Sequence, residues 1–135
     1  DQLAAVVRQD QAIPQDGLMF ADLLGQDMIG LDGGSTLTRL LEAQAAQLMR
    51  AMVLRVQVRS FESVCRAVEA RLGIGILPLA AAHSFTAAMG LRVVPLNDLW
   101  AFRQMSLVVR AEPAPGTPLA LLLDHLEACA RQPGV

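Results

Sequence analysis

Two short segments of this sequence place hydroxyl side chains where helices are expected to begin. Residues 32–36 read DGGST and residues 59–61 read RSF, each directly after an apolar run. A hydroxyl at a helix start accepts a backbone hydrogen bond, and the N–H groups exposed there favour an anion. These residue types therefore predict either the binding of a small anion or ordinary helix capping.

Five residues of these segments are candidates for ligand contact: Gly34, Ser35, Thr36, Ser60 and Phe61. Each also has a purely structural interpretation. The hydroxyls can simply cap their helices, and the phenylalanine can simply pack in the hydrophobic core. Residue types alone do not choose between the two interpretations.

Composition argues against most catalytic chemistry. All 11 basic residues are arginine, so no lysine is present to bind a nucleotide phosphate or form a Schiff base. His83 and His125 have no cysteine or carboxylate at metal-ligand spacing. Ser35 lacks a nucleophile elbow, because Leu37 occupies the place of the second glycine. We expect no enzyme activity, no metal and no cofactor.

Length and charge indicate a single globular domain. The chain has 135 residues, is 53% hydrophobic and carries a net charge of −2. Its arginines are scattered, which argues against a nucleic-acid-binding stripe in this segment. With neither a signal peptide nor a membrane span in view, the expected location is cytoplasmic. Cys65 and Cys129 are expected to be free thiols buried in the core, and a disulfide between them is the alternative.

Residues 54–78 contain the clearest structural pattern, that of a βαβ unit. Leu54, Val56 and Val58 alternate with polar residues, as in a half-buried strand. A helical stripe follows Ser60, and glycines at 73 and 75 introduce a short apolar strand. The two strands are expected to be parallel. Arg59 alternates outward and faces either solvent, the favoured interpretation, or an acidic ligand.

The remaining patterns alternate between strands and helices. The other predicted strands cover residues 3–7, 28–31, 91–96 and 102–110, and the other predicted helices cover 18–24, 36–51, 80–89 and 119–130. The last helix is expected to turn Leu119, Leu122, Leu123 and Leu126 inward. Such alternation indicates an α/β sheet covered by helices, in which ligands bind at the carboxyl ends of the strands. Both hydroxyl segments follow strands at such ends.

The amino-acid sequence of the chain resembles that of the effector-binding domain of LysR-type transcriptional regulators. The likeness is clearest in the Ser60-Phe61 helix start, in VCRAV at 64–68 and in LGIGILP at 72–78. Five further segments are similar to the family in the same order. They are residues 3–7, 20–24, 31–40, 91–101 and 107–126.

The resemblance implies a periplasmic-binding-protein-like type 2 fold, with an effector held in a cleft between two α/β lobes. It places about residues 12–106 in the second lobe, and 1–11 and 107–135 in the first. It implies a small-molecule effector, most often a carboxylate, contacted by Gly34, Ser35, Thr36, Ser60 and Phe61. The family acts as homodimers or homotetramers and binds DNA through a helix-turn-helix domain that these 135 residues lack.

The chain departs from the family pattern in extent and at one position. Much of the first lobe is missing, so residues 3–7 and the last helix are expected to expose apolar surface. Arg71 stands where the family usually has glycine, so Gly73 would have to end the helix alone. Two rivals remain: a transport receptor for solutes with the same architecture, and a small α/β enzyme. The residues that precede Asp1 would separate a regulator from a transport receptor.

Overall fold

The computed structural model describes residues 1–32 and 34–131 and divides the chain into two units. The first unit, Asp1–Gln104, contains a five-stranded sheet with its helices. The second, Met105–Val135, contains an extended segment and one helix within its described residues. Gly33 of the predicted glycine pair and the last four residues of the predicted domain lie outside the described residues.

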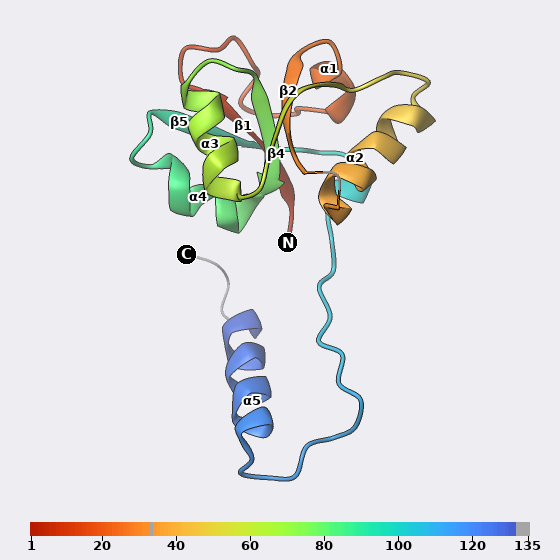
Figure 1. Ribbon diagram of the computed structural model, residues 1–135, viewed down its shortest axis with the longest axis vertical. Helices are drawn as coiled ribbons and strands as arrows, with labels where there is room; N and C mark the ends of the chain where they lie inside the picture. The colour runs from red at the N-terminus through yellow and green to blue at the C-terminus, as the bar shows by residue number, and fades with distance from the viewer. Residues whose placement is uncertain (33, 132–135) are drawn as a thin grey trace. The chain divides into compact units, whose positions relative to one another are not determined.

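Most predicted elements are present with shorter or shifted ends (Figure 1). The strands are β1 Leu3–Arg8, β2 Asp27–Leu31, β3 Val53–Val58, β4 Ile74–Pro78 and β5 Leu91–Pro95. The helices are α1 Phe20–Leu23, α2 Thr36–Gln47, α3 Phe61–Glu69, α4 Leu79–Thr86, the 3₁₀ turn η1 Leu99–Ala101 and α5 Pro118–Arg131. None of the helices in the described part of the chain combines the length and apolarity that a bilayer crossing requires.

The sheet has the order β3-β2-β4-β1-β5 and mixes parallel with antiparallel pairs. β2 is parallel to both β3 and β4, so the two strands of the βαβ unit are parallel, as predicted. β1 lies antiparallel between β4 and β5, and Leu3–Val7 is completely buried. The expectation that this segment exposes apolar surface is therefore wrong, because two strands and the covering helices enclose it.

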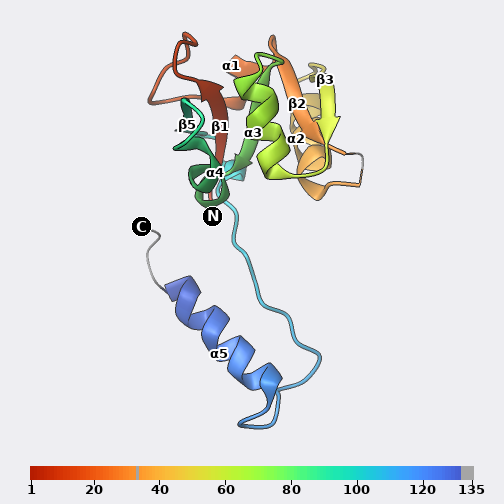
Figure 2. The same cartoon turned by 60° about the vertical axis from the view of Figure 1, so that its left-hand side comes forward.

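Helices α2 and α3 cover opposite faces of the sheet (Figure 2). Ile29 of β2 is paired with Gly75 of β4, so both residues face the same side. A Cβ at Gly75 would lie 2.4 Å from Val64 of α3, whereas a Cβ at the next β2 residue, Gly30, would lie 3.7 Å from Thr38 of α2. The chain therefore turns to opposite sides after β2 and after β3.

Helix α3 ends with arginine in the left-handed conformation. Arg71 has φ 66°; its N–H donates to Val68 O at 3.0 Å, and the Leu72 N–H donates to Ala67 O at 3.0 Å. These two bonds form a Schellman motif, whose left-handed position usually holds glycine. The expectation that Gly73 ends the helix alone is wrong, because Arg71 itself takes the turn. α2 ends the same way through Met49, at φ 52°.

Three expectations about the last third of the chain are wrong. Residues 102–110 form no strand, apart from an isolated bridge between Gln2 and Phe102, because the segment beyond it has no partner strand among the described residues. α5 buries none of its residues, so its leucines do not face a core, whereas the expectation that this helix exposes apolar surface is confirmed. Cys129 on that helix is consequently exposed, whereas Cys65 is buried as expected. No disulfide joins them.

Gly75 offers a test of the close approach between β4 and α3. We predict that Gly75→Ala lowers the free energy of unfolding by roughly 1–3 kcal/mol, because the added methyl overlaps Val64. Gly25→Ala is the matched control, since its Cβ would meet only the Arg50 side chain, at 4.0 Å. Urea unfolding of both variants measures the difference; equal losses would show that α3 does not pack closely on Gly75.

Candidate functional site

The two hydroxyl segments lie at the carboxyl ends of neighbouring parallel strands. Leu31 at the end of β2 is paired with Val58 at the end of β3, and the Asp32 N–H donates to Val58 O at 2.9 Å. From here the chain enters α2 on one face of the sheet and α3 on the other. In α/β sheets, ligands bind between the loops of adjacent strands whose helices lie on opposite faces. The position between the loops 32–36 and 59–61 meets this rule and is called the crevice below.

Ser35 caps α2 and is held firmly in place. Its Oγ accepts a hydrogen bond from the Thr38 N–H at 3.4 Å, and its own N–H donates to Asp32 O at 2.8 Å. The buried Thr38 hydroxyl donates to Leu31 O at 2.9 Å, which ties the helix start to the end of β2. Because the Ser35 hydroxyl acts here as an acceptor, its proton remains available to a ligand.

Ser60 caps α3 in an extended conformation. Its Oγ accepts from the Ser63 N–H at 3.1 Å and lies 2.9 Å from the Ser63 hydroxyl. When Ser63 is the donor of that second bond, the Ser60 proton points outward to a ligand. Two helix starts with hydroxyl caps therefore belong to one edge of the sheet, where both helix dipoles favour negative charge.

The other predicted site residues have distinct surroundings. Gly34 and Thr36 are exposed. A Cβ at Gly34 would meet no atom within 4 Å, so no other part of the described fold packs against this residue. Phe61 is half-buried against the core. Phe61 has a structural role in packing, and ligand contact by Phe61, Gly34 and Thr36 stays a prediction.

One ion pair links the two loops. The Arg59 side chain is 93% exposed and its Nε lies 3.8 Å from Oδ2 of Asp32, which is itself largely exposed. An exposed pair at this distance contributes little stability. Arg59 can therefore leave Asp32 for an anionic ligand without disturbing the fold.

Other reactive groups of the molecule do not converge on this edge. Burial raises the pKa of the Cys65 thiol, the nearby Glu62 carboxylate raises it further, and a backbone hydrogen bond partly opposes them. The thiol therefore stays protonated as part of the core. Within residues 1–32 and 34–131, no three histidine, cysteine or carboxylate side chains are grouped so that they could hold a metal ion.

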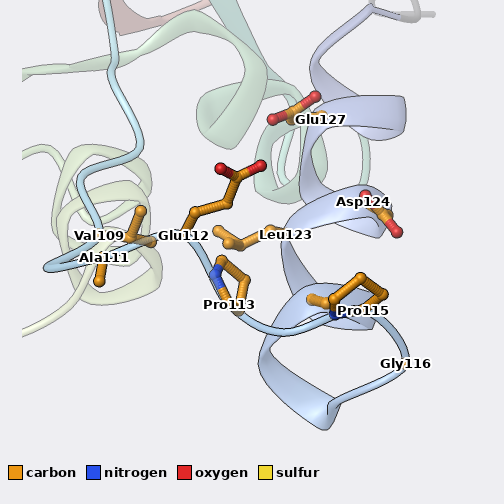
Figure 3. A pocket seen from close by; sticks show the side chains of 10 residues that line it. Val109, Ala111, Glu112, Pro113, Pro115, Gly116, Leu123, Asp124 and Glu127 are labelled. Atoms are coloured by element: carbon orange, nitrogen blue, oxygen red, sulfur yellow. The ribbon is translucent and has the colours of Figure 1, made fainter.

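A separate hollow lies within the second unit (Figure 3). It has a volume of about 500 Å³ between the extended segment and α5, with Val109 and Leu123 among its apolar walls. Glu112, Asp124 and Glu127 also line it, and three carboxylates disfavour an anionic ligand. The sequence analysis did not single out this hollow, and its chemistry does not match that of the hydroxyl segments.

Sequence reasoning missed three residues that organise the crevice. Ser63 shares its hydroxyl with Ser60, Thr38 fixes the start of α2, and Asp32 faces Arg59 across the loops. The spacing S-x-x-S at 60–63 was a usable signal, because the N-cap side chain meets the third helical residue. The pairing of Asp32 with Arg59 depends on strand order, which one sequence does not reveal.

Comparison with known proteins identifies the family. The family model described as the LysR substrate binding domain matches residues 1–130. The chain therefore belongs to the LysR substrate-binding domain family, as its sequence predicted. A search of curated proteins returned no match.

Solved structures agree with this assignment. The effector binding domain of QuiR in complex with shikimate has a TM-score of 0.61 at 17% identity, over 72% of this chain and 46% of its own. The effector binding domain of BenM with its effector benzoate has a TM-score of 0.63 at 18% identity, over 75% and 47%. The OxyR C206 mutant of Corynebacterium glutamicum has a TM-score of 0.63 at 21% identity, over 71% and 30%.

These likenesses establish the fold. The mixed α/β sheet is of the periplasmic-binding-protein-like type 2 class, as predicted. The chain spans less than half the length of the structures that it matches.

Proposed function

We propose that this chain is the effector-sensing part of a LysR-type transcriptional regulator and performs no catalysis. The observation that carries the proposal is the pair of capped helix starts at the ends of β2 and β3, in a chain that belongs to this family. The intact regulator would act in the cytoplasm as a homodimer or homotetramer and bind DNA through a helix-turn-helix domain. Effector binding would bias the arrangement of its lobes and so its DNA contacts.

The chemistry of the crevice favours a small carboxylate as effector. The Ser35 and Ser60 hydroxyls can donate hydrogen bonds to a carboxylate, and the first N–H groups of α2 and α3 attract its negative charge. Arg59 is available as a positive charge beside them. The ligands named with two of the matched structures, shikimate and benzoate, are themselves carboxylates at neutral pH. A transport receptor remains the alternative, since it would share both fold and crevice.

We further propose that the first unit supplies the second lobe and that residues 107–135 belong to the first. The division between units at Gln104 and Met105 supports a boundary close to residue 106. The sequence analysis placed residues 1–11 in the first lobe, but Leu3–Arg8 lies inside the sheet of the first unit. We therefore propose that only Asp1 and Gln2 cross between the lobes. They pair with the outgoing segment: the Arg103 N–H donates to Asp1 O at 2.7 Å, and Gln2 bridges Phe102.

An isosteric pair of substitutions tests the anion site. Aspartate and asparagine both cap helices well, so Ser60→Asp and Ser60→Asn should leave the melting temperature nearly unchanged. Only aspartate places a negative charge beside the bound carboxylate, which should weaken binding by about tenfold or more. Calorimetry on the full-length regulator, with benzoate, shikimate and related small carboxylates, measures the effect. Each acid is compared with its neutral amide.

Two results would contradict the proposal. The first is a set of amides that bind as tightly as their acids, which would show that the charge is not recognised. The second is equal affinity of the aspartate and asparagine variants for the carboxylate, which would place the ligand away from Ser60.

The exposed leucines of α5 give a test of the lobe assignment. The helix carries Leu119, Leu122 and Leu126 on one stripe, all substantially exposed, and we expect this stripe to pack on the rest of the first lobe. The 135-residue chain should therefore bind a hydrophobic dye or self-associate. Leu122→Gln with Leu126→Gln should reduce both effects.

Leu121 provides the matched control for these substitutions. It is 62% exposed but lies on the opposite side of the helix from the stripe, so Leu121→Gln should change little. Dye fluorescence and sedimentation measure both outcomes. A monomeric chain that binds no dye would contradict the assignment of α5 to an interface with a missing lobe.

A further inference from the structure

A polar hollow lies at the opposite end of the strands from the crevice. It has a volume of about 390 Å³ and is lined by Arg8, Asp10, Gln11, Arg71 and Gly73. A second hollow of about 200 Å³ shares Arg8 and Asp10 with it. Arg8 ends β1 and Gly73 precedes β4, whereas the crevice lies where β2 and β3 end. The length of a strand, roughly 15–20 Å, separates the two edges.

Two guanidinium groups in this hollow converge on one oxygen atom. Nη2 of Arg8 forms an ion pair with Oδ2 of Asp10, and Nη2 of Arg71 lies 3.5 Å from the same oxygen. The Arg8 side chain is only 19% exposed, so its position is fixed by the fold. Asp10 is 57% exposed and can turn out to water. The carboxylate thus marks the point at which two arginines present donors to an anion.

The backbone places Arg71 here against its conformational preference. Its left-handed φ of 66° is a position at which glycine costs nothing and other residues cost roughly 1–2 kcal/mol. The Schellman motif needs the backbone turn but not a long basic side chain. Met49 takes the same turn in α2, so the turn accepts side chains other than glycine without selecting a basic one. What distinguishes Arg71 is that its guanidinium lines the hollow beside Arg8.

The charge balance leaves the hollow positive. Arg8 and Arg71 contribute two positive charges, and Asp10 offsets one of them. Glu69 lines only the adjoining hollow and is paired with Arg66 of its own helix at 3.2 Å. A doubly charged anion such as phosphate matches two guanidinium groups better than the single charge of Asp10 does.

We propose that Arg8 and Arg71 form a binding site for a phosphate group, and that Asp10 occupies this site when no phosphate is bound. On binding, the Asp10 side chain turns out to solvent and phosphate oxygens accept hydrogen bonds from both guanidinium groups. The site is distinct from the carboxylate crevice and does not depend on its proposed function.

Removal of the internal competitor tests this proposal most directly. In the 135-residue chain, Asp10→Asn should tighten the binding of inorganic phosphate by about tenfold, because a neutral amide no longer competes for the arginines. Arg71→Gly should weaken phosphate binding by about tenfold while leaving the melting temperature equal or higher, since glycine suits the turn. Titration calorimetry in a phosphate-free buffer, with chloride at matched ionic strength, measures both effects.

Asp27→Asn provides the control for a general change of charge. The Asp27 backbone adjoins Gly73 of the hollow, but its carboxylate pairs with the exposed Arg55 and lines neither hollow. A general effect of charge would therefore appear in this variant too, whereas competition for Arg8 and Arg71 would not. Glycerol 3-phosphate distinguishes the sources of the ligand: binding as tight as that of inorganic phosphate supports a phosphate ester, and weaker binding supports the free ion. The proposal is overturned if Asp10→Asn fails to tighten binding, if Asp27→Asn tightens it equally, or if Arg71→Gly leaves it unchanged.

Discussion

The sheet depends on the insertion of β1 between β4 and β5. A central strand must satisfy its backbone hydrogen bonds on both sides, and Leu3–Val7 does so while fully buried. Each buried valine or leucine side chain contributes roughly 1.5–3 kcal/mol relative to exposure. The strand also anchors the ligand edge, since Gln2 O accepts from the Leu79 N–H at 2.8 Å and Leu3 O from the Leu96 N–H at 3.0 Å. Without β1, the segment after β5 would lose its attachment to the parallel strands.

Local patterns predicted the elements well, because each depends on neighbours in sequence. The alternation at 54–58 and the stripe after Ser60 both appear as expected. Long-range features were beyond such patterns. The apolar run at 3–7 does not reveal which strands flank it, and the run at 102–110 has the composition of a strand but no partner among the described residues. The leucine stripe of α5 correctly predicts a helix, but it does not predict what the stripe packs against, and none of its residues is buried in this structure.

The candidate site was predictable to the extent that it consists of helix caps. Ser35 and Ser60 were found from residue type alone, and both cap their helices. The two caps lie at the same end of the sheet because β2 and β3 pair in parallel. This pairing is a feature of the tertiary structure that local sequence does not reveal. The same pairing brings Asp32 opposite Arg59. Sequence therefore identifies the groups, and strand order decides which of them can act on a single ligand.

The central position of β1 also determines the order in which this chain can fold. Leu3–Val7 is synthesised before its partners, which lie some seventy to ninety residues later in β4 and β5. The parallel strands β2 and β3 can pair earlier, but β1 has no partner until β4 is complete at residue 78, and its other side stays unpaired until β5 is complete at residue 95. During that interval an unpaired apolar strand is exposed to solvent, a situation that favours aggregation and chaperone binding. The large sequence separation between β1 and its partner strands therefore slows the assembly of the sheet.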